Sequence, residues 1–275
     1  MRYRTAVFAL CTALLSAAST NAADRMEIKD GDLALKAMLY RPTGDGPFPA
    51  VVALHGCSGL WTPSGKMSPR FNDWGERLLA KGFAVIFPDS FGSRNLGSQC
   101  TNPKRTVRVS RERVADANAA RRWLQDQPWV TTNRVSLIGW SNGAVAALWT
   151  VRDKGVTQSP NDEFRAAVAL YPGCRELRDA AWSARVPTLL LVGGADDWTA
   201  AAPCQDMVDD ARGRSALATI VTYPGAYHDF DRPNFPVRQR KGLAFTANNN
   251  GIAHLGTNEP ARTDALKRVP EWLAR

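Results

Sequence analysis

Residues 134–147, RVSLIGWSNGAVAA, join a short, largely apolar run to a segment rich in small side chains. The run at residues 134–138 is typical of a β-strand that is buried on both faces. The small residues open a segment, residues 142–152, that we expect to be a helix. Between the two lies Gly139-Trp140-Ser141-Asn142-Gly143, which has the pattern G-x-S-x-G. On a tight turn from strand to helix, such a serine presents its hydroxyl above the sheet and is a candidate nucleophile.

The rest of the chain also alternates between apolar runs and amphipathic segments. We expect strands at residues 33–40, 50–54, 84–87, 134–138, 166–170, 188–192 and 218–223, the first of them an edge strand. We expect helices at residues 69–81, 107–127, 142–152, 200–212 and 263–273. This alternation predicts an α/β fold, with a mostly parallel twisted sheet and helices on both of its faces. One such domain is expected over residues 23–275.

Residues 231–259 form the longest stretch without a clear strand or helix pattern. Pro233, Pro236 and the run Asn248-Asn249-Asn250-Gly251 interrupt it. A stretch of this length inside a domain is typical of a functional or mobile loop, such as a lid over a site.

The N-terminal residues differ from the domain that follows them. A short cationic start precedes residues 5–18, which are nearly all apolar or small, and polar residues return soon after. This pattern predicts a secretory signal peptide at residues 1–22, cleaved near Ala22 or Ala23. A membrane anchor is the weaker interpretation, because a helix needs about 20 apolar residues to span a bilayer. We therefore expect an exported protein, periplasmic or extracellular, with no stable membrane insertion after cleavage.

Composition and charge exclude several classes of protein. The 275 residues include 21 Gly and 17 Pro, too few for a disordered or fibrous chain. The formal net charge of +9 falls to +7 once cleavage removes Arg2 and Arg4. Such a charge favours anionic surroundings without naming a partner. The basic residues are scattered, with Arg238-Gln239-Arg240-Lys241 as the one tight run, so nucleic acid is not an expected partner.

A serine nucleophile needs a base, and the chain has three histidines. In folds built around this serine turn, the chain order is nucleophile, acid, histidine. His55 precedes Ser141, and His254 lies in the irregular stretch, where we expect a surface or lid residue. His228 follows the last expected strand, at the end where ligands bind in open α/β sheets. We therefore expect His228 to be the base.

The acid that orients the base is expected after the next-to-last strand. Residues 193–198, GGADDW, contain two candidates, Asp196 and Asp197. We favour Asp196 from its register after Gly193, and Asp197 stays open as the alternative. The aspartate that does not face the base is expected to cap a helix or to be solvated.

The negative charge that develops on an attacked carbonyl oxygen needs hydrogen-bond donors. One is expected to be the backbone N–H of Asn142, the residue after the candidate nucleophile. The second is expected from the loop after the strand at residues 50–54, whose sequence is His55-Gly56-Cys57-Ser58-Gly59-Leu60. We expect the side chain of His55 itself to be a structural hydrogen-bonding group.

Several of these stretches together resemble the dienelactone hydrolase family, a branch of the α/β-hydrolases. The matching stretches span most of the domain and are residues 55–59, 87–92, 139–143, 171–174, 193–198 and 223–230. The resemblance implies the α/β-hydrolase fold, with Ser141, Asp196 and His228 as a catalytic triad. It also implies the Cys57 N–H as the second oxyanion donor and the use of no metal or organic cofactor. Dienelactone hydrolases differ in having a cysteine nucleophile and an acidic residue in place of Gly56, so the chain is more similar to exported members with a serine at the turn.

The resemblance implies a secreted serine hydrolase that cleaves a carboxylic ester or lactone of a small molecule through an acyl-enzyme. One alternative is a serine peptidase of the prolyl-oligopeptidase kind, which shares this catalytic arrangement but usually carries an extra propeller domain. The other is a non-catalytic binding protein on the same fold. The oligomeric state is left open by the sequence.

Four cysteines remain after signal cleavage: Cys57, Cys100, Cys174 and Cys204. An even number in an oxidising compartment predicts disulfides, and four cysteines allow three connectivities. All four follow the carboxyl ends of expected strands. In the strand order usual for the family that the chain resembles, Cys57–Cys100 and Cys174–Cys204 are the expected bridges. Four buried free thiols are the alternative.

Overall fold

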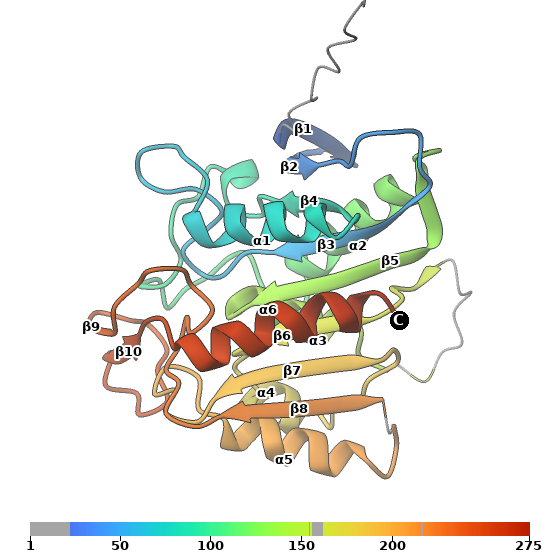
Figure 1. The fold of residues 1–275 in the computed structure, drawn as a ribbon. Helices are drawn as coiled ribbons and strands as arrows, with labels where there is room; N and C mark the ends of the chain where they lie inside the picture. The colour runs from blue at the N-terminus through green and yellow to red at the C-terminus, as the bar shows by residue number, and fades with distance from the viewer. Residues whose placement is uncertain (1–22, 154, 156–161, 216) are drawn as a thin grey trace, which may run out of the picture.

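An eight-stranded sheet forms the central layer of the computed structural model, which describes residues 23–153, 155, 162–215 and 217–275 (Figure 1). Its strands lie in the order β1-β2-β4-β3-β5-β6-β7-β8. They are β1 Ala23–Asp30, β2 Leu33–Tyr40, β3 Phe48–Leu54, β4 Ala84–Pro88, β5 Val130–Trp140, β6 Ala167–Leu170, β7 Thr188–Gly193 and β8 Ala218–Tyr223. The six strands from β4 to β8 are parallel, whereas β2 is antiparallel to both β1 and β4. The predicted signal peptide lies outside the described residues.

Helices cover both faces of the sheet (Figure 1). Helices α1 and α6 pack on one face, and α2, α3 and α5 on the other, with the short α4 beside α5. Their bounds are α1 Pro69–Ala80, α2 Glu112–Gln125, α3 Asn142–Thr150, α4 Arg175–Asp179, α5 Ala202–Ala211 and α6 Glu259–Leu273, and a short 3₁₀ turn, η1, spans Gly92–Arg94. The predicted α/β fold with a mostly parallel, doubly covered sheet is therefore confirmed.

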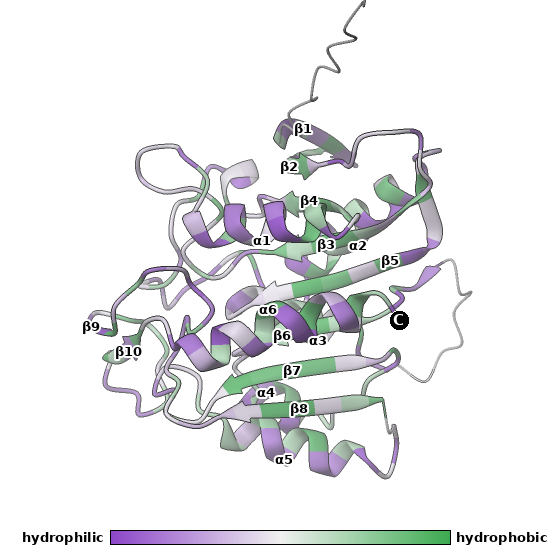
Figure 2. Cartoon of the chain, in the orientation of Figure 1, coloured by the Kyte–Doolittle hydropathy of each residue, from purple (hydrophilic) through white to green (hydrophobic). Residues whose placement is uncertain are grey.

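The parallel strands are apolar because they are buried on both faces. In β3, Val52 and Leu54 pack into the core under α2 and α3, whereas Val51 and Ala53 pack into the core under α1. Successive side chains of a strand point to opposite faces, so a strand between two helical layers needs apolar residues at every position. Figure 2 shows this continuous apolar character through the middle of β5 and β7.

Several details of the strands and helices differ from the sequence prediction. The strand at residues 33–40 is not an edge strand, because β1 pairs with it along its whole length from Ala23↔Tyr40 to Asp30↔Leu33. Strand β1 is mostly polar because it forms the edge, and Ile28 is its one buried side chain. Helix α2 begins at Glu112, after turns, and not at residue 107. Helix α6 begins at Glu259, where the Asn258 side chain accepts a hydrogen bond from the N–H of Ala261.

The irregular stretch at residues 231–259 contains a small two-stranded sheet beside the carboxyl ends of the central strands (Figure 1). Strands β9 (Arg238–Arg240) and β10 (Ala253–Leu255) pair antiparallel. The stretch is bonded to the loop after β8, since the N–H of Gly256 donates to the carbonyl of His228. This segment is therefore one wall of the region where the loops after the strands meet.

Two glycines allow β5, α3 and β3 to approach closely. A Cβ atom on Gly139 would overlap the backbone of Gly143, and a Cβ atom on Gly143 would overlap the carbonyl of Leu54 in β3. Both obstacles are backbone atoms of buried elements, which cannot rotate away. The glycines on either side of Ser141 are therefore required by packing between strand and helix.

We expect Gly143→Ala to destabilise the protein by about 3 kcal/mol or more, because it forces backbone apart in a close-packed core. Gly213→Ala is the matched control, since a Cβ atom there meets nothing within 4 Å and should change stability by about 0.5 kcal/mol or less. Urea denaturation measures both free energies of unfolding. Equal stabilities for the two variants would contradict the close-packing argument.

Candidate active site

Ser141 lies on the sharp turn between β5 and α3. Its backbone has φ 53° and ψ −117°, in a region that residues other than glycine rarely adopt. Hydrogen bonds hold it there: its N–H donates to the carbonyl of Leu170, and its own carbonyl accepts from the N–H of Val145. A conformation this unfavourable persists only where the surroundings enforce it, as they commonly do at functional sites.

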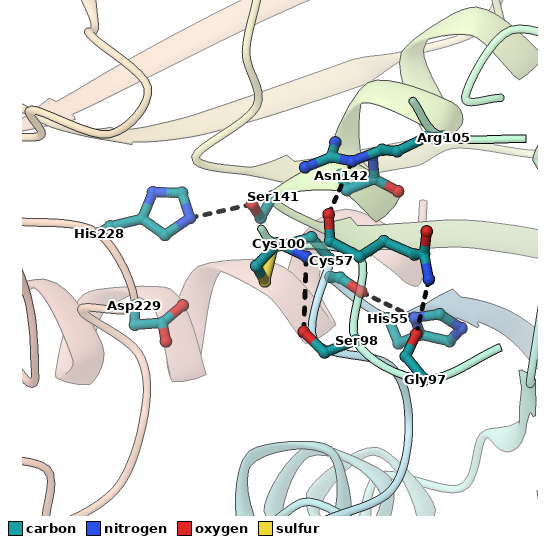
Figure 3. The surroundings of a disulfide bond; sticks show 12 residues. His55, Cys57, Gly97, Ser98, Cys100, Arg105, Ser141, Asn142, His228 and Asp229 are labelled. Atoms are coloured by element: carbon teal, nitrogen blue, oxygen red, sulfur yellow. Dashed lines mark hydrogen bonds between the residues drawn. A yellow bond between two sulfur atoms is a disulfide. The ribbon is translucent and has the colours of Figure 1, made fainter. Parts of the chain in front are cut away.

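His228 connects Ser141 to Asp196. The Nε2 atom of His228 lies 3.0 Å from the Ser141 Oγ, and its Nδ1 atom lies 2.8 Å from an Asp196 oxygen. Because a carboxylate can only accept, Nδ1 carries the proton and Nε2 accepts the hydrogen bond from the serine hydroxyl. Figure 3 shows the imidazole of His228 directed at Ser141. The structure thus brings the predicted nucleophile, base and acid into one hydrogen-bonded chain.

The two candidate aspartates have different partners. The Asp196 carboxylate is buried and accepts from the N–H groups of Trp198 and Thr199 at 2.8 and 2.9 Å, which fixes its orientation toward His228. Asp197 turns the other way and accepts from the N–H and the Nδ1 of His254, both at 2.7 Å. The structure therefore places Asp196 beside the base, and Asp197 anchors the segment that carries β10.

The two expected oxyanion donors border the same cavity as Ser141. Asn142 is the first residue of α3, where a backbone N–H has no acceptor within the helix. In the turns and loops of the described residues, no backbone hydrogen bond uses the N–H of Cys57. Gly56 packs against the turn, since a Cβ atom there would lie 3.6 Å from the Cβ of Ser141. Two N–H groups are thus available beside the hydroxyl of Ser141 (Figure 3).

Both expected disulfides are present in the structure. Cys57 is bonded to Cys100, and Cys174 is bonded to Cys204. The first bridge joins the loop at residues 55–60 to the loop after β4, and the hydrogen bond of 2.7 Å from the Gln99 N–H to the Cys57 carbonyl reinforces this link. The disulfide therefore limits the movement of the backbone that carries the Cys57 N–H.

The cavity beside Ser141 has a volume of about 510 Å³ and a mixed lining. Val107, Val145 and Phe245 contribute apolar surface, and Arg105 and Arg175 contribute positive charge. A larger cavity of about 1120 Å³ lies at the amino ends of the strands and contains none of the predicted site residues. Among the described residues, no group of three or more His, Cys, Asp or Glu side chains is arranged to hold a metal ion.

Asp231 is a site residue that the sequence prediction missed. Its carboxylate is fully buried and accepts from the indole N–H groups of Trp74 and Trp140, at 2.7 and 2.8 Å, and from the hydroxyl of Tyr171 at 2.6 Å. Trp140 immediately precedes Ser141, and Asp231 lies three residues after His228. This carboxylate therefore connects the turn that carries Ser141 to the loop that carries His228.

Asp229 extends the same buried network. Its carboxylate pairs with Arg70 of α1 at 2.5 Å, and Arg70 also donates to the Tyr171 hydroxyl at 2.7 Å. Burial raises the pKa of Asp229, but the charge and hydrogen bond of Arg70, together with other nearby basic groups, outweigh this effect and leave the pKa below its ordinary value. Burial raises the pKa of Tyr171, so its phenol stays protonated and donates to Asp231. The run His228-Asp229-Phe230-Asp231 was the only sequence signal for this network.

A sheet in this order, with a G-x-S-x-G turn after β5 and a histidine after β8 that is hydrogen-bonded to the serine of that turn, is that of an α/β-hydrolase. A model of the dienelactone hydrolase family matches residues 35–275, and the chain belongs to that family. Membership confirms the resemblance found in the sequence and makes the protein a hydrolase of ester bonds.

The chain is also similar to three known proteins. It is 24% identical over 291 aligned residues to "Putative carboxymethylenebutenolidase" of Methylorubrum extorquens, covering 97% of this chain and 88% of that protein. It is 26% identical over 153 residues to the quorum-quenching protein AidA of Acinetobacter baumannii, a match that spans 54% of this chain and about half, 47%, of that protein. The crystal structure of "Putative Dienelactone Hydrolase" from Klebsiella pneumoniae has the same fold, with a TM-score of 0.71, 21% identity and coverage of 92% of this chain and 98% of that one.

The different partners of Asp196 and Asp197 generate a direct test. We expect Asp196→Asn to lower kcat for ester hydrolysis by about a thousandfold or more, because an amide no longer holds the protonated Nδ1 of His228. Asp197→Asn should leave kcat within about threefold, since Asp197 bonds His254. Initial rates on an aryl ester measure both. The reverse order of losses would make Asp197 the orienting acid.

Proposed function

We propose that this hydrolase is an exported serine esterase that cleaves a carboxylic ester or lactone through an acyl-enzyme. The Ser141 Oγ attacks the carbonyl carbon while His228 Nε2 takes its proton. His228 then returns the proton to the leaving alkoxide, which departs as the alcohol. Water, deprotonated by His228, releases the acid and restores the serine. Asp196 holds the imidazole and stabilises its positive charge during both steps.

The oxyanion of each tetrahedral intermediate is proposed to bind the N–H groups of Cys57 and Asn142. These donors are fixed before the substrate arrives, one by the disulfide and one by the start of α3. Preorganised donors of this kind stabilise charge that appears in the transition state and not in the substrate.

The observation that carries the proposal is the continuous hydrogen-bonded chain from Asp196 through His228 to Ser141, held on a strained turn. A binding protein that had lost catalysis would have no use for the unfavourable φ of Ser141. A serine peptidase would use the same three residues, so membership in the dienelactone hydrolase family is what favours an ester over a peptide.

Export is proposed from two independent features. Residues 1–22 have the pattern of a signal peptide, and both pairs of cysteines after it are bonded. Disulfides persist in the periplasm and outside the cell but are rare in the reducing cytosol. None of the helices in the described part of the chain is long and apolar enough to cross a bilayer.

The proposed triad predicts a loss of activity without a loss of folding. Ser141→Ala and His228→Ala should each lower kcat by about a thousandfold or more, because the nucleophile and the base act together. A fluorophosphonate probe should label the wild type and fail to label Ser141→Ala. Circular dichroism checks that both variants are folded. Ester hydrolysis that persists in Ser141→Ala would overturn the mechanism, and a wild type that the probe does not label would favour a binding protein.

The proposed substrate carries an anionic group on the part that faces Arg105. This guanidinium borders the cavity, donates its Nε–H to the Gln99 carbonyl and stacks over Phe245 at 4.7 Å. Within the described residues it forms no ion pair, although burial lowers its pKa. A partly buried arginine with free donors is suited to bind a carboxylate in two hydrogen bonds.

We expect Arg105→Gln to raise KM for an aryl monoester of succinic acid about tenfold and to leave KM for the matching acetate ester within about twofold. Arg111→Gln is the control, because Arg111 is 74% exposed and does not line the cavity. Steady-state kinetics on the two esters measure the selectivity. Equal effects on both esters would remove Arg105 from substrate recognition.

A further inference from the structure

Arg113 is a fully buried cation directly behind the serine turn. It lies in the first turn of α2, and its Nη1 donates to the side-chain oxygen of Asn142 at 2.7 Å. Its Nε and Nη2 have no hydrogen-bond partner among the described residues, and its guanidinium lies 5.2 Å from the ring centre of Phe91. No described acidic side chain pairs with it within 4 Å.

The charged groups around Arg113 are occupied elsewhere. The Asp116 carboxylate is held by both terminal nitrogens of Arg94, at 2.8 and 2.9 Å. Asp89 accepts from the indole N–H of Trp61 and from the backbone of the following turn. Arg105 also faces Arg113, and its charge is of the same sign. Burial lowers the pKa of Arg113 to about 10, so the guanidinium is still positive at neutral pH.

His55 adds no charge to this cluster. Its ring is fully buried and packs edge-on against Phe91. Burial and the neighbouring Arg113 charge lower the pKa of His55 well below its ordinary value, so the imidazole is neutral. Arg113 is therefore the buried positive charge that contacts Asn142, and the Asp116 and Asp89 carboxylates attract it without pairing with it.

A buried charge without an ion-pair partner destabilises a fold, and a neutral side chain of similar length would fill the space without that penalty. The location of this charge beside Asn142 suggests a function that would offset the cost of burying it. Asn142 follows Ser141, and its N–H stands at the N-terminus of α3, where the helix dipole already favours negative charge. A fixed cation behind this N–H acts on the charge that develops on the substrate carbonyl.

We propose that Arg113 is a positioning residue for the oxyanion. Its hydrogen bond to the Asn142 side chain fixes the residue whose N–H binds the oxyanion, and its charge stabilises the tetrahedral intermediate over the neutral ester. Arg113 contacts Asn142 and acts through it. This inference rests on the proposed serine esterase mechanism.

The test compares Arg113→Met with Arg121→Met. Arg121 lies on the same helix and is also buried, but it bonds Gln125 and faces Phe164, away from Ser141. We expect Arg113→Met to lower kcat about 10- to 100-fold, with KM within about twofold, because the lost stabilisation belongs to the intermediate. An aryl boronic acid, which forms a tetrahedral adduct with the serine, should bind more weakly by a similar factor. Arg121→Met should change neither quantity.

Two further variants keep the test open if Arg113→Met does not fold. Asn142→Ala retains the backbone N–H but removes the acceptor for Arg113, and it should lower kcat about tenfold with KM unchanged. Arg113→Lys should recover most of the activity near neutral pH. Its kcat should fall as the pH rises, with a midpoint below that of any such loss in the wild type, because a buried lysine loses its proton before an arginine does.

The inference would be overturned if Arg113→Met had normal kcat and normal boronate affinity. If Arg113→Met does not fold, the same result in Asn142→Ala would overturn it. Arg113 would then be a structural residue. The failure of the underlying mechanism gives a different result, since wild-type hydrolysis would then not depend on Ser141. Ser141-dependent hydrolysis that is insensitive to Arg113→Met overturns this inference alone.

Discussion

The buried Asp231 carboxylate joins the parts of the molecule that must stay in register for the site to exist. It accepts from Trp140 at the serine turn, from Trp74 of α1 and from Tyr171 after β6. Asp231 lies three residues after His228, so these hydrogen bonds also hold the loop that carries His228. Three hydrogen bonds satisfy the carboxylate, so its burial is tolerated, and removing any one donor would leave a buried negative charge short of a partner. This buried network does not line the cavity, and it holds Ser141 and His228 at their hydrogen-bonding distance from the side away from the cavity.

A second set of constraints works from the opposite side of the cavity. The Cys57–Cys100 disulfide ties the loop at residues 55–60 to the loop after β4, and the Cys100 carbonyl accepts from the N–H of Ala244. The same segment is held at its other end by Asp197 and His254. Residues 231–259 are thus bonded to both flanks of the site, and they form a wall of the cavity through Phe245 and its neighbours. The disulfide and the buried network together surround the serine turn.

Local sequence patterns predicted the parts of the structure that depend on local rules. Continuous apolar runs identified the parallel strands, and G-x-S-x-G identified the turn, because a tight junction between strand and helix admits few other sequences. Strand β1 was missed because an edge strand can be polar. The sequence patterns did not indicate roles for Asp231 and Arg113 for another reason. Each of these residues depends on a partner that is distant in the sequence; Asn142, for example, lies 29 residues after Arg113. A lone charged residue in an amphipathic helix or a loop is usually solvated, and only the tertiary arrangement shows that these two are buried.

The roles proposed for the two arginines near Ser141 differ because the side chains lie at different depths. Arg105 borders the cavity, so its charge is felt by any anionic ligand, bound as substrate or as intermediate. An interaction of equal strength in both states lowers KM and leaves the chemical step unchanged. Arg113 lies behind Asn142, where no substrate group reaches it, and a neutral carbonyl gives it little to attract. Its attraction grows as the carbonyl oxygen becomes negative. We therefore expect the arginine at position 105 to change substrate affinity and the arginine at position 113 to lower the activation barrier.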